Sequence, residues 1–418
     1  MQPSRQIKIT FVVLILVLLG LLVITNQEAW RASRQLAIAR RALEDRDADK
    51  ALGAAREAVR LNPSQGEAHF TMARAFRRQG ELIKVRESLE RAAKLGVPPG
   101  RIRREEWLAF AQTGQMKEAR PHLRELLVNP GDDGPEICEA FANGFFVTYQ
   151  LAEAFQILDA WEKDFPQDAQ PHVFRAAYSS KTDNWIAAAK HFRKAFELAP
   201  KRIDIHISLA TTLLITREMD EAAKLLEQAL RSQPNNPEVL RGWAEVLLER
   251  GQMDQARTTL DRILQSDPNN VVALRLLGEI HSSAEQYLEA IQLLERAVAI
   301  KRNDTKARYA LGAALQRVGQ TDEALQHFEF VTKSNQVGQR LQKLIGKVRE
   351  DDKDVESRFE IAELLHEAGE PRDRLLWLRS IVALDPKHKA AHAELAKCYA
   401  ALGLLEESQK HSQLAEGK

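Results

Sequence analysis

The sequence predicts an all-α solenoid, built from helix pairs that follow one another along the chain. Prolines recur every 34 residues, at Pro166, Pro200, Pro234 and Pro268. Apolar residues between them fall at helical spacing, and the chain is 44% hydrophobic but only 6% aromatic. A fixed period of this length is typical of repeat architectures, in which a unit too small to bury its apolar face alone stacks on its neighbours.

The first element expected is a transmembrane helix over residues 9–25, after a short tail over residues 1–8. From Ile9 to Ile24 every residue is apolar except Thr10 and Gly20. With its flanks the segment has about 19 residues, roughly 28 Å as a helix, which is close to the thickness of a hydrocarbon core. The residues expected to contact lipid are Ile9, Phe11, Leu14, Leu18, Leu22 and Ile24.

Two alternatives for this segment are a cleaved signal peptide and a buried helix. The stretch from Thr25 to Trp30 has no convincing small-residue cleavage site, which favours an uncleaved, single-pass anchor in the inner or plasma membrane. Basic residues lie on both sides, namely Arg5 and Lys8 before the segment and Arg31, Arg34, Arg40 and Arg41 after it. Because long polar domains translocate largely regardless of charge, the repeat array is expected on the extracytoplasmic side.

The repeat itself reads as two amphipathic helices joined by a short turn. When Pro268 is numbered position 32, the unit has Trp243 and Ala244 at positions 7 and 8, Leu247 at 11, Gly251 at 15, Ala256 at 20, Leu260 at 24 and Ile263 at 27. The glycine lies where the first helix must stop, and the proline marks the exit from the second helix.

These positions resemble the tetratricopeptide repeat (TPR) family, whose 34-residue unit has Trp, Leu-Gly, Tyr, Ala, Phe, Ala and Pro there. The resemblance is closest at Leu311-Gly312, Gly319, Ala324 and Phe328, and at Leu277-Gly278, Ala290, Leu294 and Ala297. It implies a right-handed solenoid of about eleven units. The expected starts are near residues 32, 66, 100, 135, 169, 203, 237, 271, 305, 355 and 389.

In this frame the chain has repeats 1–3 over residues 32–134, repeats 4–9 over 135–338 and repeats 10–11 over 355–418. The step between the ninth and tenth starts is 50 residues rather than 34. The extra residues, 339–354, are expected to form an inserted helix, because Leu341, Leu344, Ile345 and Val348 follow helical spacing. For this inserted helix, a structural role that changes the curvature of the solenoid is favoured over a role as a hinge or as a docking element.

No motif for catalysis or for a cofactor is found. The chain has 60 basic and 59 acidic residues, so no uniform basic field points to nucleic acid. Two cysteines cannot supply a four-thiolate zinc site. His388, His392 and Cys398 are the best metal candidates, but the alternative, histidines that cap or line a helix pair, is favoured. The sequence therefore predicts neither an enzyme nor a metal protein.

The TPR resemblance implies a concave surface formed mainly by positions 2, 5, 9 and 12 of the first helix of each unit, which often binds peptides or helices. Projected onto this chain, the candidate partner-binding residues are Arg40, Arg74, Arg77, Arg101, Arg104, Asn143, Arg241, Arg275, Glu356 and Glu363. Residues 26–120 hold 20 Lys and Arg against 13 Asp and Glu, whereas residues 236–418 hold 26 against 29. The alternatives are a basic seat for an acidic segment or anionic lipid, and a merely solvated set of charges.

The function expected is a membrane-anchored scaffold that mediates protein–protein interactions, in the assembly or maturation of envelope complexes. The alternative is a non-catalytic regulatory or targeting subunit of a separate glycan-modifying or cytochrome-maturation enzyme. The expected partners are proteins and the membrane, and not nucleic acid.

Overall fold

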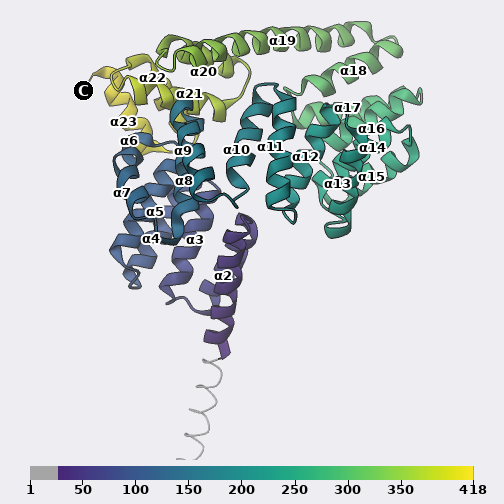
Figure 1. Ribbon diagram of the computed structural model, residues 1–418. Coiled ribbons are helices and arrows are strands. Elements are labelled where there is room, and N and C mark those ends of the chain that lie inside the picture. The colour runs from purple at the N-terminus through teal and green to yellow at the C-terminus, as the bar shows by residue number, and fades with distance from the viewer. Residues whose placement is uncertain (1–26, 418) are drawn as a thin grey trace, which may run out of the picture. The chain divides into compact units, whose positions relative to one another are not determined.

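The computed structural model describes residues 27–417, without the side chains of Asp132 and Arg372, and every regular element in this range is helical (Figure 1). The chain divides into two compact units. The N-terminal unit ends at Ile157 and the C-terminal unit begins at Leu158, so the boundary falls inside helix α9 (Leu151–Asp164). Each unit is a run of helices in which neighbours in sequence pack side by side.

The N-terminal unit begins with a helix over residues 27–44. The elements that follow are α2 (Ala48–Leu61), α3 (Gly66–Arg78), α4 (Leu82–Lys94), α5 (Pro99–Gln112), α6 (Met116–Ala119), the 3₁₀ turn η1 (Arg120–His122), α7 (Leu123–Val128), the 3₁₀ turn η2 (Gly131–Asp133), α8 (Gly134–Val147) and α9.

The C-terminal unit continues with α10 (Gln170–Lys181), α11 (Trp185–Leu198), α12 (Ile203–Ile215), α13 (Met219–Ser232), α14 (Pro237–Glu249), α15 (Met253–Ser266), α16 (Val271–Ser283) and α17 (Tyr287–Ile300). It ends with α18 (Thr305–Arg317), α19 (Thr321–Glu350), α20 (Val355–Glu367), α21 (Pro371–Leu384), α22 (Lys389–Ala401) and α23 (Leu405–Glu416). The predicted all-α solenoid of stacked helix pairs is confirmed.

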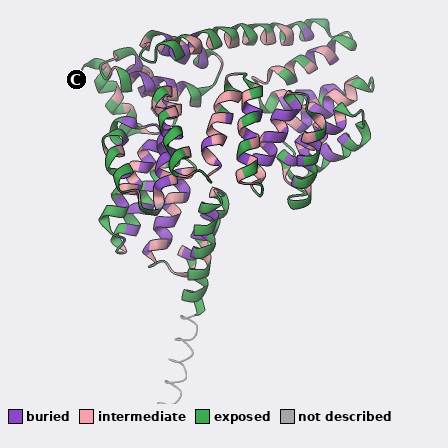
Figure 2. Cartoon of the chain, viewed as in Figure 1, coloured by how far each residue is buried: buried purple, intermediate pink, exposed green. Residues whose placement is uncertain are grey.

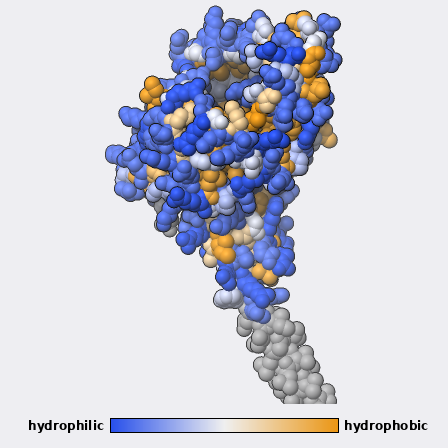
Figure 3. Space-filling model, turned by 90° about the vertical axis from the view of Figure 1, so that its right-hand side faces the viewer, coloured by the Kyte–Doolittle hydropathy of each residue, from blue (hydrophilic) through white to orange (hydrophobic). Residues whose placement is uncertain are grey.

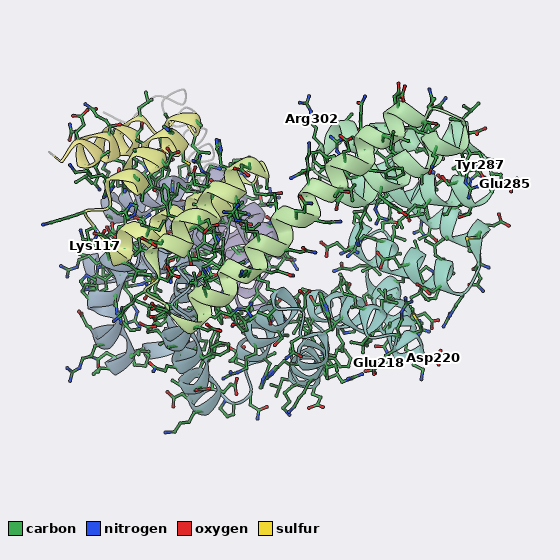
Figure 4. The ribbon with its side chains drawn as sticks, turned by 90° about the horizontal axis from the view of Figure 1, so that it is seen from above. Lys117, Glu218, Asp220, Glu285, Tyr287 and Arg302 are labelled. Atoms are coloured by element: carbon green, nitrogen blue, oxygen red, sulfur yellow. The ribbon has the colours of Figure 1, made fainter. Side chains whose placement is uncertain are left out.

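The turn inside each helix pair needs one residue in the left-handed region. Glycine supplies it at Gly251 and Gly319, with φ of 71° and 85°. Where the sequence has no glycine at that place, another residue adopts the same conformation, at Arg46, Tyr149, Asp183, Arg217 and Glu285. Figure 4 labels residues at two of these turns, namely Glu218 and Asp220 just after Arg217 at the α12–α13 turn, and Glu285 itself with Tyr287 at the α16–α17 turn. The backbone geometry therefore repeats even where the turn residue does not.

Close packing within a pair explains the small residues of the repeat. A Cβ placed on Gly278 would lie 2.6 Å from Cγ of Leu294, and one on Gly312 would lie 2.9 Å from Cε1 of Phe328. These are positions 8 and 24 of the repeat, so in these two repeats the second helix lies too close to position 8 for a side chain to fit there without a shift. Ala256, at position 20, is completely buried. In Figure 2 the buried residues accordingly line the faces on which helices pack, and the face drawn in Figure 3 is mainly hydrophilic with scattered hydrophobic residues.

Consecutive pairs are joined at the prolines. Arg262 and Arg296, in the second helices α15 and α17, donate hydrogen bonds to the carbonyl oxygens of Pro234 and Pro268, at 2.7 and 3.0 Å. In each case the proline ends the preceding repeat. Proline stops a helix but leaves its carbonyl free to accept, which gives the next repeat a fixed contact.

The third pair is irregular. Its second helix is split into α6, η1 and α7 around Pro121, and η2 then leads directly into α8. The ring of Trp107 stacks on His122 with centroids 3.8 Å apart. Proline in a helix interior removes a backbone hydrogen bond and clashes with the preceding turn, which accounts for the break.

Helix α19 has 30 residues and differs from the expected arrangement. Residues 339–350, expected to belong to a separate inserted helix, instead continue α19 without a break. No proline lies between Thr321 and Glu350, and Gly338 and Gly346 have helical backbone. The second half of α19 packs on α20 and also reaches the α10–α11 pair, where Gln342 donates a hydrogen bond of 3.1 Å to Asp183.

Among residues 27–417, no helix combines the length and the apolar character needed to cross a membrane. The expected anchor over residues 9–25, with all of its lipid-contacting residues, lies outside the described residues. The last helix, α23, buries none of its side chains, which fits the polar outer face expected of a terminal helix.

Candidate partner-binding surfaces

The structure places the arginines expected on the inner face of the N-terminal unit in two different environments. Arg74 and Arg77 lie on α3 and pair with carboxylates, and Arg104 lies on α5, 3.7 Å from the carboxylate of Asp133. Arg40, on the helix over residues 27–44, and Arg101, at the start of α5, keep 53% and 45% of their side chains exposed. Arg40 and Arg101 are therefore the most exposed of these five arginines.

Arg77 is the centre of a buried ionic network. Its side chain is fully buried, its Nε atom lies 2.5 Å from Oε1 of Glu105, and its Nη2 atom contacts Glu136 of α8. Arg74 and Arg78 reach the same Glu136 carboxylate at 2.6 and 3.0 Å. Such a network is costly to bury and more costly to leave incomplete. It therefore holds α3, α5 and α8 together and is not a seat for a partner.

The electrostatics of Glu136 support this interpretation. Burial by itself would raise the pKa of Glu136, but the charges of Arg77, Arg74 and Arg78 outweigh it and hold this pKa far below its ordinary value. The Glu136 carboxylate is thus ionised at neutral pH and offsets part of the charge of the arginines around it.

Two further residues expected on the inner face, Arg104 and Asn143, also make contacts within the N-terminal unit. Arg104 donates a 3.1 Å hydrogen bond to the carbonyl of Asn129 and also contacts the carbonyl of Pro130, so it fixes the loop before η2. Asn143 donates a 2.7 Å hydrogen bond to the carbonyl of Gln112 at the end of α5. Both side chains are half-buried and have structural partners.

Sequence reasoning missed the acidic half of this network. Glu136 and Glu139 occupy positions 2 and 5 of the fourth repeat, the same positions as Arg101 and Arg104 in the third. Projecting those positions in the fourth repeat as well would have placed carboxylates opposite the arginines. Glu105, at position 6, gave no such signal.

Arg40 and Arg101 converge on Glu67, the second residue of α3. Nη2 of Arg40 lies 2.8 Å from Oε2 of Glu67, and both terminal nitrogens of Arg101 contact the same carboxylate. Hydrogen bonds from Arg101, followed by its charge and that of Arg40, lower the pKa of Glu67. A cavity of about 870 Å³ adjoins this triad, lined by Ser33, Leu36, Ala37, Arg40, Arg41, Glu44, Asp45, Gln65 and Glu67.

In the C-terminal unit, the expected inner-face residues form matched ion pairs. Arg241 pairs with Glu245 on α14 at 3.1 Å, and Arg275 pairs with Glu279 on α16 at 2.6 Å. The corresponding residue on α18 is Tyr309, which is 60% exposed. These helices therefore display a row of partly buried ion pairs that ends in an exposed aromatic ring.

The acidic candidates of the tenth repeat differ in their surroundings. Glu356, at the start of α20, is exposed, whereas Glu363 is half-buried and lies 3.5 Å from Arg374. Arg374 is buried and pairs with Glu394 of α22 at 2.5 Å. A charged residue thus replaces the usual alanine at position 20, and a carboxylate of the next repeat balances it.

The histidines considered as metal ligands are used in backbone contacts. His388 accepts a hydrogen bond from the Ala391 amide and caps α22, and Nε2 of His392 lies 3.0 Å from the carbonyl of Pro386. Within the described part of the chain, no group of three or more His, Cys, Asp or Glu side chains could hold a metal ion.

Comparisons with known families agree with the helix-pair geometry. One description of the tetratricopeptide repeat matches residues 213–280, and another matches residues 36–93 and 181–237. Residues 36–93 and 181–280 therefore contain tetratricopeptide repeats. A match to anaphase-promoting complex, cyclosome, subunit 3, covers residues 249–331. The TPR repeats form a scaffold suitable for protein–protein interaction.

Several solved structures resemble the TPR array at low identity. A human IFIT1 dimer with PPP-AAAA is 16% identical, and the alignment covers 83% of this chain and 89% of that one, with a TM-score of 0.43. A tetratricopeptide repeat protein from Parabacteroides merdae is 15% identical over 60% of this chain and 92% of its own, with a TM-score of 0.32. YrrB, described as a TPR protein with an unusual peptide-binding site, is 24% identical over 50% and 99%, with a TM-score of 0.29. No curated protein matches the sequence.

Proposed function

We propose that this chain is a membrane-tethered, non-catalytic TPR scaffold that binds segments of partner proteins on the first helices of its repeats. The observation that carries the proposal is the row formed by Arg241, Arg275 and Tyr309 on α14, α16 and α18. These side chains are at least partly exposed and come from three consecutive repeats. An extended partner segment could contact all three at once.

The chemistry of the row indicates what kind of segment would fit. Each arginine is already paired with a glutamate four residues later, so the row is close to neutral and offers both donors and acceptors. Aromatic and arginine side chains are enriched in the residues that dominate binding energies. A polar segment with an apolar residue opposite Tyr309 meets these requirements, with an affinity of about micromolar, roughly −8 kcal/mol.

The membrane part of the proposal rests on the apolar segment from Ile9 to Ile24. We propose that it anchors the chain once in the inner or plasma membrane, with the repeats on the extracytoplasmic side, where they would assist the assembly or maturation of envelope complexes. A reporter that is active in only one compartment, fused after Lys418, tests this orientation. Activity of a cytoplasm-specific reporter there would contradict it.

Partner binding is tested by site-specific photo-crosslinking in cells with the full-length chain. A photoreactive amino acid replaces Arg275 or Tyr309 on the row, and the matched control replaces Lys224, which lies in a second helix. Crosslinks to the same partner from both row positions, and not from the control, are expected. Equal crosslinking from all three positions, or none from any, would contradict the proposal.

A further inference from the structure

The terminal helix α23 is held on α22 by few contacts. The two helices pack side by side at the end of the chain (Figure 1), but α23 buries none of its side chains. The Oγ atom of Ser408 donates a 2.9 Å hydrogen bond to the carbonyl of Ala396. His411 reaches two side chains of α22, His392 and Tyr399. A helix with so little buried area depends strongly on each of these contacts.

The hydrogen bond between the two histidines has a defined direction. Nδ1 of His392 lies 2.7 Å from Nδ1 of His411, and Nε2 of His392 lies 3.0 Å from the carbonyl oxygen of Pro386. Because a carbonyl oxygen only accepts, the proton of neutral His392 is on Nε2, and its Nδ1 atom accepts. Nδ1 of His411 must therefore donate. Nε2 of His411 is then the nitrogen of the pair that can take up a proton.

The docked pair can hold one added proton but not two. A first proton on Nε2 of His411 leaves the hydrogen bond intact. A second proton must bind Nδ1 of His392, and two N–H donors on two cationic rings would then face each other across 2.7 Å. His392 is only 3% exposed, so water does little to screen that repulsion. The doubly protonated pair is therefore incompatible with the packing of α23 on α22.

The surroundings of His411 favour its neutral form. Burial, followed by the charges of His392 and Lys410, lowers the pKa of His411 to about 4. The charge of Arg379 on α21 adds to this effect, whereas Glu407, one turn earlier on α23, opposes it. The ordinary pKa of histidine is 6.5, so the released helix binds this proton more readily than the docked helix. Docking is therefore strongest above about pH 6.5 and weakens as the pH falls toward 4.

We propose that His392 and His411 form a pH-dependent latch, which holds α23 on α22 at neutral pH and weakens that packing in acid, because the docked pair holds one added proton and the released pair holds two. The inference goes beyond the proposed function, since it concerns the end of the solenoid and needs no partner. Release of α23 would uncover the part of α22 that includes Ala396 and Tyr399.

Hydrogen–deuterium exchange of the full-length protein in detergent, followed by mass spectrometry, measures this opening. The protection of the α23 amides is corrected for the intrinsic pH dependence of exchange. It should fall by about twentyfold between pH 7 and pH 5, given a pKa of about 4 in the docked helix and 6.5 in the released one. Helix α15 belongs to a repeat without histidine, so its protection should change little and reports on the integrity of the fold.

Variants then assign the effect to the latch. His411→Asn places an amide near the position of Nδ1, and an amide can either donate to His392 or accept from it, so a second proton no longer conflicts with docking. The pH dependence of α23 protection should therefore disappear. His366→Asn, the same change at an exposed position on α20, should leave that dependence intact. Ser408→Ala should lower α23 protection by the same factor at both pH values, because the lost hydrogen bond does not titrate.

The proposal is overturned if α23 is equally protected at pH 7 and pH 5, or if α15 loses protection in parallel with it. It is also overturned if His411→Asn keeps the full pH dependence, or if His366→Asn removes it. None of these outcomes depends on whether the repeats bind a partner, so the proposed function is tested separately.

Discussion

Nε2 of His206 lies 2.7 Å from the carbonyl oxygen of Pro200, six residues earlier, and thereby joins the start of α12 to the end of the preceding repeat. His69 and His392 make the same contact with Pro63 and Pro386, at 3.1 and 3.0 Å. All three histidines occupy position 4 of their repeats. This contact gives a recurrent histidine a structural role that requires neither a metal nor a substrate.

The first prediction concerns this contact. His206→Ala should lower the free energy of unfolding by about 2 kcal/mol, because it removes a buried ring and leaves the Pro200 carbonyl without its partner. His206→Leu should cost less, since Leu240 and Leu274 fill the same position in the seventh and eighth repeats. Urea unfolding measures both changes. Unchanged stability in both variants would contradict the assigned role.

A second prediction concerns the closest approach within a helix pair. Gly278→Ala should destabilise the protein by about 1–3 kcal/mol, because the added methyl would overlap the Leu294 side chain. Gly346→Ala is the matched control, since nothing lies within 4 Å of a Cβ at that helical glycine. This control should stabilise the protein by about 0.5–1 kcal/mol through helix propensity. Thermal unfolding that showed the same sign for both variants would refute the packing argument.

The third prediction tests the buried network. Glu136→Gln should lower the free energy of unfolding by about 3–5 kcal/mol, because Arg77 would remain buried beside a weaker partner. Glu153→Gln removes the partner of Arg120, which is 58% exposed, and should cost less than about 1 kcal/mol. Chemical unfolding of both variants gives the comparison. If Glu136→Gln and Glu153→Gln lowered the free energy of unfolding by similar amounts, the buried network would contribute no more than an exposed ion pair.

The pH dependence of stability follows from the same residue. The pKa of Glu136 is lowered on folding from its ordinary value of 4.5, so the unfolded chain binds this proton more readily than the folded one. Stability from Glu136 is therefore complete at neutral pH and is lost progressively as the pH falls below about 4.5. The difference in stability between the natural protein and Glu136→Gln should shrink between pH 6 and pH 3. A constant difference across that range would contradict the shift.

The fifth prediction concerns α19. Besides the hydrogen bond from Gln342 to Asp183, the guanidinium of Arg349 lies 5.9 Å from the ring centroid of Tyr178 on α10. Cysteines at positions 342 and 183, in a chain without its two native cysteines, should be joined rapidly by a short bismaleimide. Cysteines at 333 and 183 should react much more slowly, because residue 333 lies more than two turns earlier on α19. Similar rates for the two pairs would show that α19 does not hold this position in solution.

The sequence was sufficient for the helix pairs because their determinants are local. Leu277-Gly278 and Leu294 lie within one repeat, and a 34-residue period places them in contact without knowledge of the rest of the chain. The turn at Glu285 was harder to foresee, since a non-glycine residue adopts the left-handed conformation there. Packing of the helices on both sides of the turn outweighs the preference of a non-glycine residue for negative φ.

The site was less predictable because its residues come from different repeats. Arg77 was expected on an open surface, but Glu105 and Glu136 lie 28 and 59 residues away in sequence and meet it only through the packing of α3, α5 and α8. Arg40 and Arg101 are exposed, and their role in partner binding stays a prediction, whereas Glu67 between them was not foreseen. The continuity of α19 was also missed, because helical spacing shows that a segment is helical and not where the helix begins.

The unbroken α19 has a mechanical consequence. A helix of 30 residues is a rod of about 45 Å with no joint along its length. A displacement of α20 would therefore be passed to α18 through this helix. It would not be taken up by bending at a turn between two helix pairs. The ninth and tenth repeats are therefore expected to move together, because they share one continuous helix.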